Sequence, residues 1–370
     1  MPINLFSSDA PVRIQPFFGY RSTRRVQLSV RAVRGEDPEF EQRGFLDNVR
    51  TMIEQYASHE VEGLEVTLEY EGGDGRTHRQ THRTDAEGFA HFSVPLKKPT
   101  ALPLNTAWER SEVRWSPISG KEKGGSTEAF ILAPGRSANM GVISDIDDTI
   151  LETGITGSVK AIARNWQRVL AQMPDQRELV PGARDLYSAL GGGAHVDGHD
   201  AIPQARPRPV FYVSSSPWNL FSYLVTFKRQ QDMPLGPVML RDWGFNRETL
   251  GSKGHGSHKR SAIERILNEY PEMKFALVGD DTQKDLVAFS EIAASHTSQV
   301  AAIFIRRVSQ EPLNELEQVS AKKIEQARVP FWIGEDYTQA ITFLSEAGLE
   351  SDHRLETLVK TVSEGDTPPQ

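Results

Sequence analysis

Two acidic segments hold the residue types that could do chemistry in this sequence. The first, Ser144-Asp-Ile-Asp-Asp-Thr149, places two carboxylates two positions apart, where an apolar run ends. At a strand end both can face one pocket, with Asp145 as nucleophile and Asp147 as general acid on a leaving oxygen. A polar turn without a chemical role is the alternative.

The second acidic segment, Gly279-Asp-Asp-Thr-Gln-Lys-Asp285, places three carboxylates within six residues after another apolar run. Hard carboxylate oxygens suit Mg²⁺, which usually binds through one or two carboxylates plus waters and phosphate. Asp280, Asp281 and Asp285 are therefore candidate metal ligands.

A serine cluster ends a third apolar run, Tyr212-Val-Ser-Ser-Ser-Pro217. The Ser214 hydroxyl could hydrogen-bond a phosphoryl oxygen. Ser216 before Pro217 is also a good helix N-cap, and both roles are compatible.

A fourth segment supplies a cation. Lys259 lies in the first turn of the helix expected to follow Ser257, where a positive charge opposes the helix dipole. That small cost favours a functional role for Lys259, and Lys253 is the competing candidate.

The C-terminal part of the chain must position these residues. Short apolar runs predict strands at 141–144, 210–213, 238–240, 275–278 and 301–305, and helical periodicity predicts helices at 159–172, 218–230, 261–269 and 286–294. Such alternation is typical of a parallel sheet covered on both faces. Its site lies beyond the carboxyl ends of the strands, and the four segments follow or flank those ends. We expect Phe331-Trp-Ile-Gly334 to belong to a region that packs a last helix on the sheet.

The N-terminal part has a different period. Apolar residues alternate from 26 to 32 and from 64 to 70, which predicts half-buried strands, with one helix near 46–56. We predict an α/β fold class with three parts: residues 1–135 as a mainly β, sandwich-like domain, 136–350 as the parallel-sheet domain, and 351–370 as a C-terminal segment with a disordered tail.

Composition excludes several classes of protein. The 370 residues include no cysteine, which excludes disulfide scaffolds, thiolate zinc sites and cysteine nucleophiles. A net charge of −8 argues against general nucleic-acid binding. The chain has no apolar run of membrane-spanning length, and its start lacks the pattern of a secretory signal. We expect a cytoplasmic protein.

The order and strand context of these segments resemble the haloacid dehalogenase (HAD) superfamily. Within it, Ser144-Asp-Ile-Asp-Asp-Thr-Ile150, Tyr212-Val-Ser-Ser-Ser-Pro-Trp-Asn219 and Leu277-Val-Gly-Asp-Asp281, with Thr153-Gly-Ile-Thr-Gly157, resemble the catalytic domain of the fungal actin-patch phosphatidate phosphatase and its bacterial relatives. That branch often has Gly-Asp-Ser where this chain has Gly279-Asp280-Asp281, which leaves open which acid binds the metal.

The resemblance implies a HAD-like Rossmannoid sheet and an aspartyl-phosphate mechanism. Asp145 attacks phosphorus, Asp147 acts as acid and then base, and Mg²⁺ is held by Asp145, the Asp147 carbonyl and Asp280. Ser214 and Lys259 hold the remaining phosphoryl oxygens, and Asp285 orients Lys259 or a metal-bound water, while Asp281 is a ligand or a neighbour of one. The candidate substrate-binding residues are Thr149, Ser215 and Lys253.

The implied reaction is Mg²⁺-dependent hydrolysis of phosphatidate to diacylglycerol and phosphate. The alternatives are hydrolysis of a soluble phosphomonoester and a non-catalytic binding protein. Two basic segments could give peripheral membrane contact: residues 10–35, with six arginines, no acid and Phe17-Phe-Gly-Tyr20, and the helix expected at 159–172, with Lys160, Arg164 and Arg168 on one face. A solvated sheet edge and a solvent-facing row of charges are the alternatives for these two segments.

Overall fold

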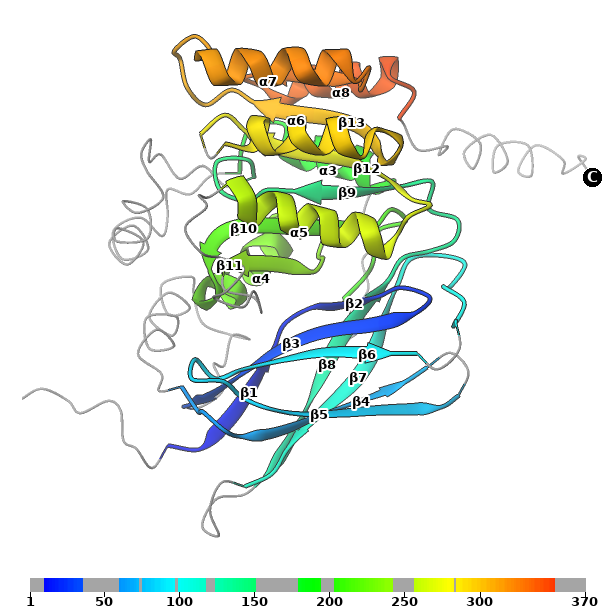
Figure 1. Ribbon diagram of the computed structural model, residues 1–370, viewed down its shortest axis with the longest axis vertical. Coiled ribbons are helices and arrows are strands. Elements are labelled where there is room, and N and C mark those ends of the chain that lie inside the picture. Colours follow the sequence, from blue (N-terminus) through cyan, green and yellow to red (C-terminus); the bar gives the residue numbers. More distant parts are fainter. Residues whose placement is uncertain are drawn as a thin grey trace, which may run out of the picture.

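The structure, a computed structural model, describes residues 10–35, 60–72, 75–96, 99–117, 124–150, 179–193, 203–241, 256–282 and 284–349. These residues form two β-sheets, one built from the N-terminal part and one from the C-terminal part, and helices that cover the second sheet (Figure 1). The α/β class is confirmed. The helices expected at 46–56 and 159–172, Lys253, and the segment 351–370 lie outside the described residues.

The N-terminal sheet has eight strands. They are β1 (Val12–Pro16), β2 (Gly19–Arg21), β3 (Arg25–Arg34), β4 (Glu65–Glu71), β5 (Thr77–Arg83), β6 (Phe89–Pro95), β7 (Ala107–Trp115) and β8 (Gly125–Ala133). Their order is β1-β3-β2-β8-β7-β4-β5, with β6 paired to β3. All pairs are antiparallel except β2 with β8. Hydrogen bonds thus connect every strand into one sheet, and the sandwich-like description stays a prediction.

Buried apolar residues of this sheet form one hydrophobic core. Leu28 and Val30 of β3 lie in the same buried cluster as Val66 and Leu68 of β4, although the two strands are not hydrogen-bonded neighbours. In β4 the burial alternates residue by residue, as expected of a strand with one face in water. The predicted period is therefore confirmed for this strand.

The basic segment 10–35 does not form the surface that its composition suggested. Arg21 and Arg31 are each 2% exposed, and Phe17 and Tyr20 are buried in the core. Arg21 donates to both carboxylate oxygens of Glu109, at 2.7 Å each. Arginines buried against distant carboxylates cannot contact a bilayer, so Arg21 and Arg31 are not part of a membrane surface, while Arg24 and Arg25 are exposed and membrane contact stays a prediction.

The C-terminal sheet is six-stranded and wholly parallel, in the order β11-β10-β9-β12-β13-β14. Its strands are β9 (Met140–Ser144), β10 (Val210–Pro217), β11 (Val238–Arg241), β12 (Lys274–Asp280), β13 (Val300–Arg306) and β14 (Phe331–Gly334). The five predicted strands are confirmed. The segment 331–334 also joins the sheet, as its edge strand, because Phe331 to Gly334 pair in register with Ile303 to Arg306.

The helices follow the strands in alternation. They are α3 (Ala183–Gly191), η1 (Trp218–Leu220), α4 (Phe221–Gln230), α5 (Gly256–Glu269), α6 (Asp285–Ser295), η2 (Thr297–Gln299), α7 (Glu315–Gln326) and α8 (Tyr337–Glu346). Helices α5, α6 and α7 form a row along one face of the sheet, and α3 packs with α8 behind it (Figure 1). No helix in the described ranges is both long and apolar enough to cross a membrane.

The two sheets share a hydrophobic core. Phe17, Phe18 and Phe89 of the N-terminal part belong to the cluster that fills the C-terminal part. The rings of Phe17 and Phe18 lie 4.8 and 5.4 Å from the ring of Phe221 in α4. The N-terminal sheet is therefore packed directly against the helix that follows the serine segment.

Candidate active site

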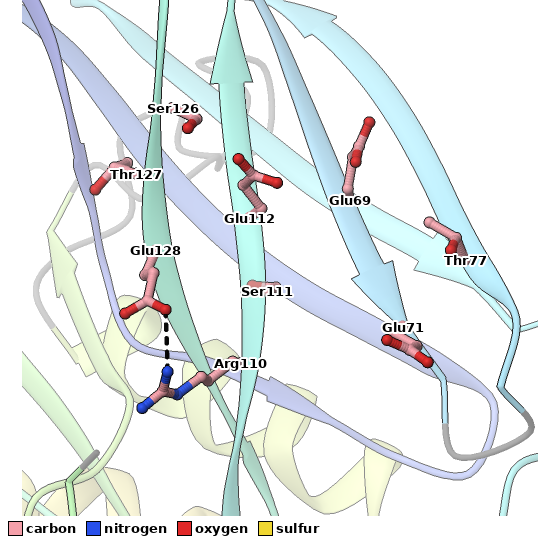
Figure 2. Close-up of a pocket in the computed structure, with 9 residues that line it drawn as sticks. All are labelled: Glu69, Glu71, Thr77, Arg110, Ser111, Glu112, Ser126, Thr127 and Glu128. Atoms are coloured by element: carbon pink, nitrogen blue, oxygen red, sulfur yellow. Dashed lines mark hydrogen bonds and ion pairs between the residues drawn. The ribbon is translucent and has the colours of Figure 1, made fainter. Parts of the chain in front are cut away.

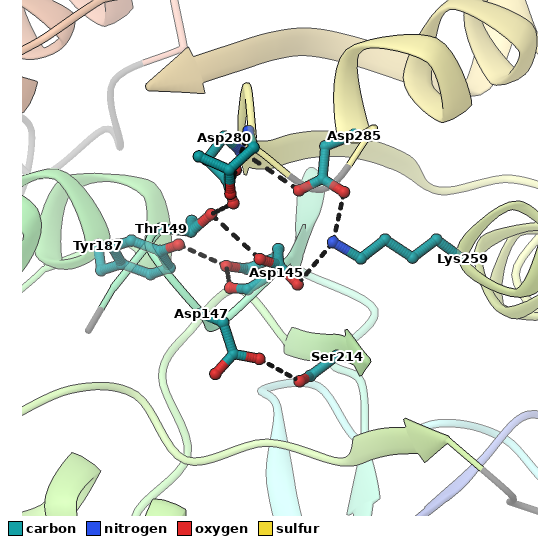
Figure 3. A network of polar contacts seen from close by, with 10 residues as sticks. Asp145, Asp147, Thr149, Tyr187, Ser214, Lys259, Asp280 and Asp285 are labelled. Atoms are coloured by element: carbon teal, nitrogen blue, oxygen red, sulfur yellow. Dashed lines mark hydrogen bonds and ion pairs between the residues drawn. The ribbon is translucent and has the colours of Figure 1, made fainter. Parts of the chain in front are cut away.

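The predicted chemical residues meet at the carboxyl ends of three adjacent strands. Asp145 follows β9, Ser214 lies in β10 and Asp280 ends β12. Two helices complete the site, since Lys259 lies in the first turn of α5 and Asp285 opens α6. Figure 3 shows these side chains pointing toward one another from four separate parts of the chain.

Asp145 and Lys259 form a buried ion pair, with Lys259 Nζ 2.9 Å from Asp145 Oδ1. Lys259 Nζ also contacts Asp285 Oδ1. The lysine and the two aspartates are each at most 2% exposed. One ammonium group therefore bridges two carboxylates, one from the end of β9 and one from the start of α6.

Thr149 contacts both the Asp145 carboxylate and a third carboxylate, that of Asp280. Its hydroxyl lies 3.3 Å from Asp145 Oδ2 and 3.1 Å from Asp280 Oδ2. Thr149 was predicted to bind substrate, and here it orients the two carboxylates. Asp280 is held further by Thr282, whose backbone N–H and hydroxyl donate to Asp280 Oδ1 at 2.5 and 2.6 Å.

The three carboxylates form a cluster that could hold a metal ion. One oxygen each from Asp145, Asp280 and Asp285 lies within 4.8 Å of the others, and all three residues are buried. Burial raises the pKa of Asp145 well above its usual range, with Asp285, Asp280 and Asp147 adding to the rise and Lys259 opposing it. Burial likewise raises the pKa of Asp285 to about 6, which Lys259 again opposes.

The charge balance fits a cation at this cluster. Burial alone would lower the pKa of Lys259, but Asp145 and Asp285 raise it above its ordinary value, so the lysine is charged. One ammonium nevertheless faces three buried carboxylates, and like charges at this separation disfavour full ionisation. A divalent cation with hard oxygen ligands would relieve that repulsion, so the residues fit a metal such as Mg²⁺.

Asp147 lies beside the carboxylate cluster and has a partner of its own. Ser214 Oγ donates to Asp147 Oδ2 at 2.9 Å, and both side chains are buried. The turn that aims Asp147 continues through Asp148, which has a left-handed φ of 57°. Arg306 at the end of β13 donates to the Asp148 carbonyl at 2.8 Å and fixes this turn.

Asp281 is placed away from the carboxylate cluster. Its Oδ2 forms an ion pair with Arg307, 2.7 Å from Nε, and its Oδ1 accepts from the backbone N–H of Val308 at 2.8 Å. These bonds tie the end of β12 to the end of β13. The carboxylate that sequence analysis left open as a ligand therefore serves, in this arrangement, to join two strand ends.

The structure also contains partners that sequence analysis did not identify. Ser144 Oγ lies 2.5 Å from the Asp145 carbonyl oxygen and contacts the hydroxyl of Tyr187 in α3. At Gly279 an added Cβ would lie 2.5 Å from Asp285 Oδ2, so glycine allows that carboxylate to approach the strand. The side chain of Ser215 lies outside the described part, as does Lys253.

Comparison with known proteins gives a consistent result for this half of the chain. Residues 140–307 match the family model of the phosphatidate phosphatase APP1 catalytic domain. The chain is 33% identical over 167 residues to phosphatidate phosphatase APP1 of Saccharomyces cerevisiae, which covers 45% of this chain and 26% of that protein. It is 25% identical over 182 residues to an uncharacterized protein of Schizosaccharomyces pombe, covering 49% of this chain and 27% of that protein.

The resemblance to the phosphatidate phosphatase catalytic domain is thus confirmed for these residues, while the chain spans only about a quarter of the length of either relative. Among solved structures, a calcium-binding mutant of Bacteroides uniformis β-glucuronidase 2 aligns with 93% of this chain and 39% of its own, at 13% identity and a TM-score of 0.26. A likeness that low carries no inference.

Proposed function

We propose that this protein is a Mg²⁺-dependent phosphomonoesterase that acts through an aspartyl-phosphate, with phosphatidate as substrate. The observation that carries the proposal is the buried cluster of Asp145, Asp280 and Asp285 with Lys259, in a segment similar to a phosphatidate phosphatase catalytic domain. The arrangement supports a HAD-like catalytic domain over residues 136–350, preceded by a sandwich-like domain over 1–135 and followed by the segment 351–370.

The residues act in a definite order. An oxygen of Asp145 attacks phosphorus, the bond to the leaving oxygen breaks, and Asp147 gives that oxygen its proton. Asp147, now ionised, takes a proton from water as the water attacks the aspartyl-phosphate, which releases phosphate and restores Asp145. The 2.9 Å bond from Ser214 holds Asp147 ready beside the nucleophile.

Electrostatic stabilisation supplies much of the rate. Lys259 keeps a fixed positive charge 2.9 Å from Asp145 Oδ1, close to the phosphoryl oxygens of a substrate that Asp145 attacks. When substrate binds, the Ser214 hydroxyl can turn from Asp147 to a phosphoryl oxygen. A bound Mg²⁺, held by Asp145, Asp280, Asp285 and the Asp147 carbonyl, would neutralise charge so that one anion can attack another.

A soluble phosphomonoester is the second candidate substrate. It is favoured by the burial of Arg21 and Arg31 with Phe17 and Tyr20, which removes these side chains from any membrane contact. The chemistry proposed for the site is the same in both cases. A cytoplasmic location, with the protein at a membrane only while it hydrolyses lipid, accommodates either substrate.

The test is phosphate release from phosphatidate in mixed micelles and from an aryl phosphate. Both are measured with and without Mg²⁺, for the wild-type protein and for Asp145→Asn. We expect release to require Mg²⁺ and Asp145, with Asp145→Asn slowing it at least about 10⁴-fold because the nucleophile is lost. Turnover of the aryl phosphate alone would select the soluble substrate, and a near-wild-type rate in Asp145→Asn would refute the mechanism.

A further inference from the structure

A second hollow lies where the N-terminal sheet meets helix α5, outside the catalytic cluster. It has a volume of about 350 Å³. One wall is the outward face of the β3–β6 pair, with Gln27, Ser29 and His91, and the other wall is α5, with Arg265 and Glu269. The two parts of the chain therefore build this cavity together.

One contact between the two parts lies at this hollow, which we call the junction groove. Gln27 Nε2 donates to Glu269 Oε1 at 2.9 Å, and both residues line the groove. A second contact joins the same strand to the C-terminal part, since the Arg31 guanidinium lies 2.9 Å from the ring centroid of Trp218, directly after β10.

Cationic and hydroxyl groups gather at this groove. Arg25 and Arg265 line it, and Arg25 Nη1 donates to Ser93 Oγ at 3.3 Å. An adjoining hollow of about 470 Å³ shares both arginines and adds Arg24. Among the described residues, Arg24 and Arg25 form no ion pair with a carboxylate.

The acids at the same place have partners of their own. Glu264 Oε1 accepts from Arg260 Nε at 2.8 Å, and Glu269 accepts from Gln27. In the described part of the chain, Arg24 and Arg25 are therefore cations of the junction that no carboxylate pairs with.

A buried hydroxyl beside the groove has no partner in the described part of the structure. Tyr20 is 2% exposed and lines the groove, and its hydroxyl has no hydrogen-bond partner among the residues that the structure describes. The charges that act on this hydroxyl are those of Arg265, Glu269 and Arg25. A bound acceptor in the groove beside Arg25 and Arg265 would give this hydroxyl a partner.

From these observations we propose that the junction groove binds the phosphate group of a ligand, separately from the catalytic site. Guanidinium groups form paired, charge-assisted hydrogen bonds to phosphate, and a volume of about 350 Å³ accommodates a phosphate with a small substituent. The phosphate can belong to a soluble molecule or to a lipid headgroup. The proposal does not depend on phosphatase activity.

A contrasting hollow provides the control. On the outer face of β4, β7 and β8 a cavity of about 470 Å³ is lined by Glu69, Glu71, Glu112 and Glu128 (Figure 2). Its Arg110 is bound to Glu128 at 3.3 Å. Arg110→Gln therefore removes a surface arginine of the same sheet without touching the junction groove.

The experiment counts phosphate bound per chain by equilibrium dialysis with labelled inorganic phosphate and Mg²⁺. The proteins are wild type, Tyr20→Phe, Arg25→Gln/Arg265→Gln and Arg110→Gln. Wild type and Arg110→Gln should bind one more equivalent than the double variant. That equivalent should bind about tenfold more weakly in Tyr20→Phe and at least about 100-fold more weakly in the double variant, because charge-assisted bonds are lost. Hydrolysis of an aryl phosphate should stay within about twofold in all four proteins, because none of these side chains lies in the carboxylate cluster.

A second arm distinguishes the source of the phosphate. Flotation with vesicles of phosphatidylcholine and phosphatidylglycerol is compared for the same four proteins. The groove is assigned to a lipid headgroup if the wild type binds vesicles, the double variant does not, and no extra equivalent of free phosphate is bound. It is assigned to a soluble ligand if the extra equivalent of free phosphate is bound and the vesicles are not. The proposal is overturned if the double variant matches Arg110→Gln in both arms, or if acetate competes as well as phosphate.

Discussion

Replacing Lys228 with methionine should stabilise this protein, and by an amount that depends on pH. Lys228 lies in α4 and is 1% exposed. Its Nζ lies 3.7 Å from the ring centroid of Tyr212, and no hydrogen-bond acceptor contacts it among the described residues. Burial lowers the pKa of Lys228 from 10.5 to about 7. Its ammonium group is therefore held in the fold at a cost.

The size of that cost follows from the two pKa values. The difference between 10.5 in the unfolded chain and about 7 in the fold corresponds to about 5 kcal/mol at pH 6, where the lysine is charged in both states. Between pH 7 and 10.5 the unfolded chain binds the extra proton, so the free energy of unfolding rises with pH. Near pH 10 less than about 1 kcal/mol of the cost remains.

Methionine keeps the volume and the contact with the Tyr212 ring but carries no charge. The cation–π attraction that it gives up is worth up to about 2 kcal/mol. We therefore expect Lys228→Met to raise the free energy of unfolding by about 3 kcal/mol at pH 6, with the gain falling steadily as pH rises toward 10.

The assay is urea unfolding of the wild type and Lys228→Met at pH 6, 7, 8 and 9, with the difference between the two proteins as the measured quantity. Using the difference removes the titration of groups that both proteins share. A difference that does not change with pH would refute the titration of Lys228 in the fold. A less stable variant at pH 6 would show that its ammonium group has a partner.

Three further predictions concern the catalytic cluster. Lys259→Met, the matched change at the other buried lysine, should abolish phosphate release. It should also lower the free energy of unfolding by about 3–5 kcal/mol at pH 8, because two buried carboxylates lose their counter-ion. A variant as stable as the wild type in urea unfolding would contradict the ion pairs. Asp280→Asn should raise the Mg²⁺ concentration for half-maximal activity at least about tenfold. Asp281→Asn should leave that concentration within about threefold and lower the free energy of unfolding by about 1–3 kcal/mol, because the contacts with Arg307 and Val308 are lost. Equal changes of the Mg²⁺ concentration in the two variants would place Asp281 among the ligands. Removing metal with EDTA should lower the melting temperature of the wild type and not of Asp280→Asn, as measured by calorimetry, and an equal loss in both would separate the cluster from metal binding.

The strands of the C-terminal sheet could be predicted because burial on both faces leaves a distinctive sequence. From Phe275 to Gly279 every residue of β12 is buried, and only a run without polar side chains allows that. A polar residue at the end of such a run has no structural reason to be buried. The convergence of Asp145, Ser214 and Asp280 was therefore predictable from three such endings.

The edge strand β14 could not be predicted in the same way. Its four residues are only partly buried apart from Trp332, so the run Phe331 to Ile333 is compatible with a strand or with packing beside a helix. Position in the sheet decides the outcome, since pairing with Ile303 to Arg306 completes the hydrogen bonds of β13. A short apolar run does not contain that information.

The partners of the site residues depend on register between strands far apart in sequence. Because Asp280 pairs with Arg306, the next residues, Asp281 and Arg307, emerge side by side and form their ion pair. Tyr187 reaches Ser144 from a helix 43 positions away, and in sequence it is one more apolar position of that helix. Residue type predicts which side chains can do chemistry, and register decides which of them meet.

The arginines of residues 10–35 show where local composition misleads. A basic segment with aromatic residues has the pattern of a membrane-binding surface, yet Arg21 is neutralised by Glu109, 88 positions later, and Arg31 by Glu60 and the ring of Trp218. Each guanidinium is buried because its partner comes from a distant part of the chain, β7 for Arg21 and η1 with residue 60 for Arg31. Arg24 and Arg25, where β3 begins, lack such carboxylate partners in the described structure and line the hollow that adjoins the junction groove. Composition marks all of these arginines alike, and the packing of the N-terminal sheet against α5 decides which of them stay exposed.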